Sequence, residues 1–185
     1  MYKLTTKPTI PHPSRILRRT SRSSSHLRAL LLYSLIVLGH FAEHLVQAYQ
    51  VFVLHWHPRI AGGILGLYYP KLAQNEVLHI AYNSAQLTGL ILLFPGFQQS
   101  SNAARRWWNI ALVAQSWHFF EHVLLQVQYI SGIYLFGASR QTSLLEFFFP
   151  RVQLHLTYNL LALIPTAIAV IFYLSCYVSK EKARL

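Results

Sequence analysis

Four long apolar blocks constrain the fold of this chain more than any other feature of its sequence. They span residues 29–54, 77–97, 107–130 and 152–177. A helix crosses about 30 Å of hydrocarbon with about 20 residues, so each block is long enough to do so. Because a backbone in lipid must satisfy its own hydrogen bonds, such blocks form helices. The sequence therefore predicts an all-α integral membrane protein with four transmembrane helices.

The distribution of Lys and Arg predicts how these helices are oriented. Of the 16 basic residues, 12 lie in segments 1–28, 98–106 and 180–185, on one side of the expected spans, and four lie on the other side. Basic loops stay in the cytoplasm, so we expect both termini there, and a bacterial plasma membrane as the location. The net charge of +11 resides in tails and short loops beside apolar blocks, which argues against a nucleic-acid partner.

The chain divides into a membrane domain and two basic tails. Residues 1–28 are rich in Pro, Ser and Arg and have little to bury, so we expect a disordered cytoplasmic tail. Residues 29–177 form the transmembrane domain, and residues 178–185 form a second cytoplasmic tail. Cys176 is the single cysteine, which excludes a disulfide framework or a thiolate metal site within one chain.

Several motifs occur twice in the same order. HFAEH at 40–44 returns as HFFEH at 118–122, LHIAYN at 78–83 returns as LHLTYN at 154–159, and YYPK at 68–71 is answered by FFPR at 148–151. The pattern predicts two tandem helical hairpins, with repeat 1 at about 29–98 and repeat 2 at about 107–177. The non-cytoplasmic loops remain apolar, so we expect them either on the membrane surface as short helices or lids, or packed on the bundle.

Polar residues share one face on each expected helix. At about 100° per residue, His40, Glu43, His44 and Gln47 fall within one arc of about 100°. The same spacing recurs around His118, and the histidines of all four spans fall in the outer half of the bundle. An ionisable group at such depth costs about 2.5–3.5 kcal/mol, whereas an interhelical hydrogen bond returns about 0.6–2 kcal/mol. A functional centre explains the cluster better than a structural network does.

These residue types predict a metal centre. Imidazole and carboxylate ligands without thiolate suit Zn, Fe, Mn or Cu(II), and we expect two divalent transition-metal ions, iron first and zinc second. Haem is less favoured, because histidines at i and i+4 lie only about 6 Å apart along the axis. Whether the ions share one centre or occupy two is left open. The expected ligands are His40, Glu43, His44, His79, His118, Glu121, His122 and His155, and the residues expected to support them are Tyr82, Asn83, Tyr158 and Asn159.

The preferred function is a metal-dependent oxidoreductase that acts on an apolar or lipid-borne substrate, with Glu43 and Glu121 bridging ions or moving protons. The clustered histidines broadly resemble those of the membrane fatty-acid desaturases and hydroxylases, which hold two irons. The chain departs from that pattern, because it lacks an HxxHH box and has Glu inside each motif.

HxxEH is also the pattern of the inverted zinc proteases. Alternatives are a zinc hydrolase with Glu as general base, a haem or metal electron-transfer subunit of a larger membrane complex, and an ion carrier.

Overall fold

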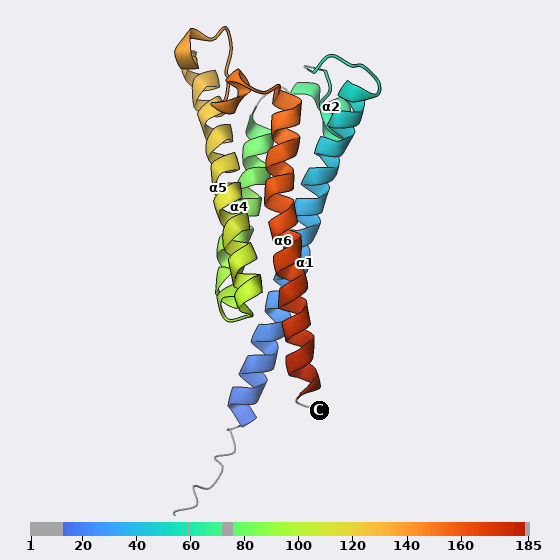
Figure 1. Cartoon of the computed structure of the whole chain (residues 1–185), viewed down its shortest axis with the longest axis vertical. Coiled ribbons are helices and arrows are strands. Elements are labelled where there is room, and N and C mark those ends of the chain that lie inside the picture. The colour runs from blue at the N-terminus through green and yellow to red at the C-terminus, as the bar shows by residue number, and fades with distance from the viewer. Residues whose placement is uncertain (1–12, 59, 72–75, 184–185) are drawn as a thin grey trace, which may run out of the picture.

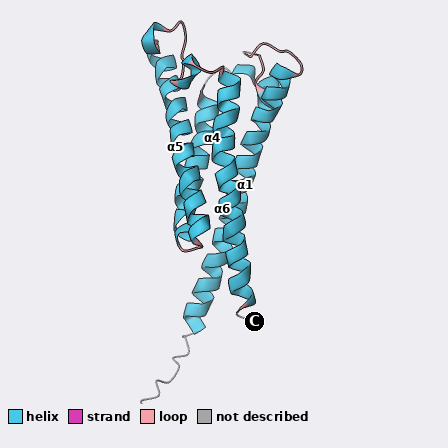
Figure 2. Cartoon of the chain, viewed as in Figure 1, coloured by secondary structure: helices cyan, strands magenta, loops and turns pink. Residues whose placement is uncertain are grey.

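The structure is a computed structural model that describes residues 13–58, 60–71 and 76–183. Four long helices form a bundle (Figure 1). They are α1 (Pro13–Phe52), α4 (Val77–Gln98), α5 (Asn102–Ser131) and α6 (Arg151–Lys182). Short elements lie in the connections: α2 (Gly63–Tyr68) and the 3-10 turns η1 (Leu135–Gly137) and η2 (Leu145–Phe147). No strand occurs in this part of the chain (Figure 2).

Three stretches are long and apolar enough to cross a membrane: Ser25–Phe52 within α1, Val77–Gln98, and Arg151–Lys182. Large apolar side chains point outward from them, such as Leu92 and Ile171, which are 74% and 63% exposed. Such an exposed apolar surface is unfavourable in water but favourable in contact with lipid. The helices therefore indicate a membrane protein, as the sequence predicts.

The first helix begins earlier than expected. Residues 13–28, predicted to be disordered, form the first turns of α1. Pro13 lies at the first helical position, where its fixed φ and missing N–H fit a helix, and no glycine or further proline follows in that segment. The rest of the predicted tail, residues 1–12, lies outside the described residues.

The ends of α5 follow from local sequence. The Ser101 side chain accepts a hydrogen bond from the Ala104 backbone N–H at 3.2 Å, which caps the start of the helix. At the other end Gly132 takes a left-handed conformation with φ of 68°, and its N–H bonds the Gln128 carbonyl. This conformation strains other residues, so glycine sets the end of the helix.

An apolar core fills one half of the bundle. We call the end at which the chain finishes the terminal end, and the opposite end, which carries α2, η1 and η2, the loop end (Figure 1). The Trp108 ring is fully buried, stacks on Phe97 at 3.6 Å between centroids, and donates to the Leu90 carbonyl at 3.0 Å. This core consists of Leu30, Tyr33, Val37, Leu90, Leu93, Phe97, Ala104, Trp108, Ala111 and Ala169.

Glycines bring α4 close to α1 in this half. Gly89 and Gly96 are seven residues apart, and a side chain at either would collide with a ring of α1, Tyr33 or His26. Those two rings are also seven residues apart, so the two helices meet in a regular register. This close contact at the terminal end fixes how α1 and α4 present their polar residues toward the loop end.

Candidate metal centre

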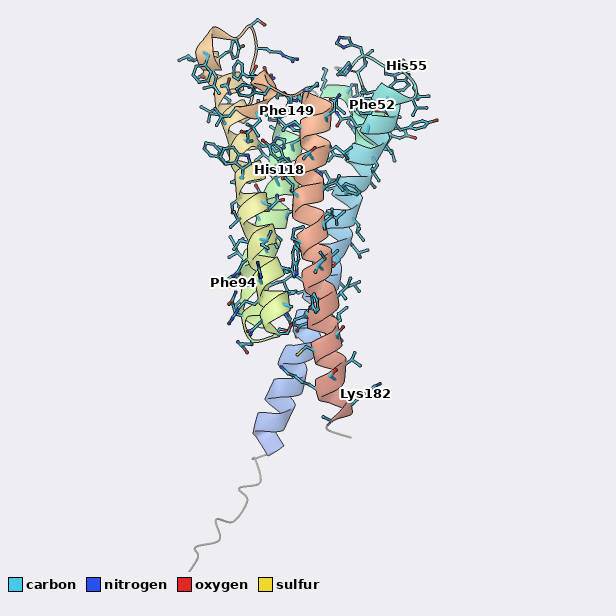
Figure 3. All side chains as sticks on the ribbon, viewed as in Figure 1. Phe52, His55, Phe94, His118, Phe149 and Lys182 are labelled. Carbon is cyan, nitrogen blue, oxygen red and sulfur yellow. The ribbon has the colours of Figure 1, made fainter. Side chains whose placement is uncertain are left out.

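Six histidine rings fill the bundle interior toward the loop end. Neighbouring ring centroids lie 4.6–6.4 Å apart, and every ring neighbours at least two others. His118 is fully buried, and Figure 3 shows it in the half of the bundle nearer the loops. The cluster comprises His40 and His44 of α1, His79 of α4, His118 and His122 of α5, and His155 of α6.

Within each HxxEH motif the two histidines meet through the same nitrogen. The Nε2 atoms of His40 and His44 are 3.3 Å apart, and those of His118 and His122 are 3.1 Å apart. Helical spacing of four residues causes this, because side chains at i and i+4 project side by side. Each pair therefore presents two nitrogen atoms to one point.

The ring state of His44 follows from its partner Gln47. The Gln47 Nε2 donates to the Ala61 carbonyl at 2.7 Å, which turns its Oε1 toward His44 Nδ1 at 3.3 Å. Since a carbonyl oxygen only accepts, the hydrogen lies on His44 Nδ1. A neutral His44 therefore keeps a lone pair on Nε2, which faces His40.

His122 is held in the same state by Glu76, which lies just before α4. The Glu76 Oε2 is 2.8 Å from His122 Nδ1, and its Oε1 accepts from the Arg151 guanidinium. Burial alone would raise the pKa of Glu76, but the His122 hydrogen bond and the Arg151 charge outweigh burial and lower it to about 2. An ionised carboxylate only accepts, so His122 carries a hydrogen on Nδ1, and a neutral His122 then keeps its lone pair on Nε2.

The sequence gives no role to Glu76, because it stands in a connection outside the repeated motifs. One signal could have marked it. The chain has only five acidic residues and no aspartate, and Glu43, Glu76, Glu121 and Glu146 all belong to the loop end or to the helix turns that face it. Because acidic residues are so few and four of them gather near this end, each of these four carboxylates is expected to have a specific partner.

The two glutamates of the motifs face the connections. The Glu43 Oε2 accepts from the backbone N–H groups of Ile64 and Leu65 at 2.7 and 3.2 Å. Glu121, 1% exposed, faces the Ser143 side chain and the Leu144 backbone N–H without a well-formed hydrogen bond to either. Both expected ligands thus lie between the histidine cluster and a connection.

Two glutamines outside the predicted ligand set, Gln50 and Gln128, also hold these connections. Gln50 accepts from the Gly63 N–H at 3.0 Å and donates to the Gly63 carbonyl at 3.2 Å. Gln128 accepts from the N–H groups of Leu135 and Thr142 and donates to the Thr142 carbonyl. The signal was present, since Gln50 and Gln128 are separated by the same 78 positions as the HxxEH motifs.

The tyrosines and asparagines that were expected to support the metal ligands make different kinds of contact with the histidines. Tyr82 stacks on His40 with centroids 4.7 Å apart, and Tyr158 lies 5.2 Å from His118 and accepts from Trp117 Nε1. Asn83 and Asn159 instead donate to the backbone carbonyls of His79 and His155, each one turn earlier on its own helix. The tyrosines contact the imidazole rings, whereas the two amides donate to the backbone, and Asn83 Oδ1 also accepts from Gln115 Nε2 at 2.7 Å.

The donor set suits a transition metal, although its atoms are not gathered around one point. Among residues 13–58, 60–71 and 76–183, no three His, Cys, Asp or Glu side chains stand as ligands of a single ion. His79 instead stacks on His122, with planes 12° apart. However, His79 Nδ1, His118 Nδ1 and both Glu121 oxygens are buried without a hydrogen bond among the described residues. Buried polar atoms normally have partners, and a bound ion would supply them.

A small cavity adjoins the part of the cluster formed by α1 and α4. Its volume is about 30 Å³, which holds a water-sized ligand. Its lining is His40, Glu43, His44, Gln47, Gly62, Leu65, Leu78, His79 and Tyr82.

Comparison with known proteins finds no match: no family model, no curated protein and no solved structure matches the chain. Its function must therefore be inferred from its own residues.

Proposed function

We propose that all four long helices span the membrane as two tandem hairpins with both termini in the cytoplasm. In addition to the three apolar stretches, we propose α5 as the fourth span. Its 30 residues are enough to cross the membrane, and its Val113 and Ile130 side chains are 71% and 74% exposed, as expected for a surface that contacts lipid. The matched contacts of Gln50 and Gln128 support a duplicated origin.

We further propose that the histidine cluster binds transition-metal ions. One observation carries this proposal: Gln47 and Glu76 hold the Nδ1 hydrogens of His44 and His122, and the Nε2 atom of each of these two rings faces the Nε2 atom of a second histidine. Metal-binding histidines are almost always oriented in this way, with the other ring nitrogen donating to an oxygen. The six histidines are the proposed ligands, and Glu121 is the carboxylate best placed to join them.

The proposed activity is oxidative, with iron as the preferred metal and an apolar or lipid-borne substrate. When bound, iron would supply one-electron chemistry and dioxygen activation. The histidines hold the metal, Gln47 and Glu76 fix two ring orientations, and the tyrosines fix the planes of His40 and His118.

Zinc hydrolysis is less well supported by these contacts. A carboxylate would serve as the base of such a hydrolase, but Glu43 accepts two backbone hydrogen bonds and Glu76 pairs with Arg151 and His122. Glu121 is left for that role, and we propose it as a ligand instead. Haem is disfavoured as well. A macrocycle between two helices would have to push apart rings such as those of His44 and His155, whose centroids are 6.1 Å apart.

Metal content and the absorption spectrum of the purified protein test the proposal. We expect about two irons per chain without a Soret band, and loss of metal in the double variant His44→Ala/His122→Ala. His57→Ala, in the exposed connection after α1, is the matched control and keeps its metal. Bound zinc would favour a hydrolase and bound haem an electron-transfer subunit. No metal under any loading condition would overturn the metal centre.

A further inference from the structure

The two halves of the histidine cluster differ in exposure. The first half consists of the cluster residues of α1 and α4, and the second half of those of α5 and α6. In each of four residue pairs related by the repeated motifs, the first member is half-buried and the second is buried. The pairs are Glu43 and Glu121, Leu78 and Leu154, His79 and His155, and Tyr82 and Tyr158.

The cavity lies on the same side as this exposure. It is lined by all three histidines of the first half, and Gly62 and Leu65 of the connection after α1 border it. Glu43, Gln47 and Gln50 bond the backbone of residues 61–65, which holds that connection beside the cavity. A ligand that enters this cavity meets the side chains of all three histidines of the first half.

The two halves also differ in charge. Gln47, which orients His44, is neutral, and Leu125 stands at the matching position of α5. His122 is oriented instead by the Glu76 carboxylate, which pairs with Arg151. The ring orientation in the second half thus depends on a buried carboxylate, which strengthens His122 as a ligand, whereas in the first half it depends on a neutral amide.

We propose that the first half is the open half, where an external ligand reaches the metal, and that the second half is closed. This inference rests on the proposed metal centre. The cavity volume limits the ligand to one to three heavy atoms, such as water, dioxygen or azide. Metal sites that react keep a position for such a ligand, whereas structural sites are closed. A lipid-borne substrate would then react at the cavity mouth and would not enter the cluster.

Deuterium exchange at the imidazole C2 position, read by mass spectrometry, tests the difference in access without metal. We expect His79 to exchange several-fold faster than His155, because His79 is half-buried beside the cavity and His155 is 4% exposed. Equal rates, or faster exchange at His155, would overturn the inference.

Azide binding to the metal-loaded protein tests the ligand site, with matched variants in the two halves. Leu65→Trp fills the cavity, and Leu144→Trp introduces the same ring into the connection whose Leu144 backbone N–H faces Glu121 of the second half. We expect one azide per chain in the wild type, at least about tenfold weaker binding in Leu65→Trp, and less than about a twofold change in Leu144→Trp. Leu78→Phe narrows the same cavity from α4 and replaces Leu65→Trp if that variant does not fold.

The outcomes separate the two proposals. If the protein binds metal and azide binds at both halves, the inference of an open first half is wrong, although the metal centre remains supported. The same holds if only Leu144→Trp blocks azide binding. Absence of metal in the wild type overturns the proposed function and with it this inference.

Discussion

At the scale of single residues, the glutamates show what a helical pattern can and cannot reveal. The six histidines were predicted as ligands from their spacing, and the structure brings them together. Glu43 lies at the edge of the polar arc, however, and the sequence does not show which neighbour lies beyond that edge. There the connection after α1 folds back, so its Ile64 and Leu65 amides meet the carboxylate. Glu76 was missed because its role depends on His122 and Arg151, which lie far away in sequence.

Replacement of Glu76 tests its role in orienting His122. We expect Glu76→Gln to lower metal affinity about 10- to 100-fold, because the carboxylate holds the Nδ1 hydrogen and raises ligand basicity. Competition with a chelator measures this affinity. Glu146→Gln is the control: Glu146 also contacts Arg151, at 3.5 Å, and in the described part of the chain it bonds the Ser143 N–H and no histidine of the cluster. An equal loss in both variants would assign the effect to Arg151.

At the scale of the helices, the apolar blocks predicted well where the long helices lie, but they predicted only part of how these helices pack against one another. The second block was expected at 77–97 and α4 is Val77–Gln98. The sequence did not show that Gly89 packs against Tyr33, because helix register depends on which faces meet in space. Nor did it show that Glu43 and Gln50, seven residues apart on one edge of α1, both bond the same connection.

Two glycine substitutions test the close contact of α1 and α4. Gly89→Ala places a methyl group into the Tyr33 ring, which cannot yield because it is 5% exposed and packs on Trp108. We expect destabilisation by about 1–3 kcal/mol, seen as a lower Tm in detergent. Gly39→Ala on α1 meets nothing within 4 Å, so we expect it to be neutral or to stabilise by up to about 1 kcal/mol. Similar Tm values for the two variants would contradict this packing.

At the scale of the whole molecule, the division into two cores explains how a membrane bundle carries so many histidines. The apolar core at the terminal end packs the helices, and the polar core toward the loop end holds the histidines. All-helical architecture and membrane helices were predicted from the sequence and are confirmed. Four spans and a duplicated hairpin stay predictions.

Cysteine labelling tests the number of spans. In a Cys176→Ser background, Gln99→Cys lies between α4 and α5, and Ser139→Cys lies between α5 and α6; both positions are exposed. If α5 crosses the membrane, a membrane-impermeant maleimide labels Ser139→Cys in intact cells and Gln99→Cys only after lysis. Labelling of both positions from the same side would mean that α5 does not cross.

X-ray absorption at the metal edge of the loaded protein tests the central claim most directly, because it identifies the atoms bound to the metal. The six-histidine centre predicts first-shell scattering dominated by nitrogen, with the outer-shell pattern of imidazole, and its loss in His44→Ala/His122→Ala. Scattering dominated by oxygen, or unchanged in that variant, would contradict a metal centre built from the two HxxEH motifs.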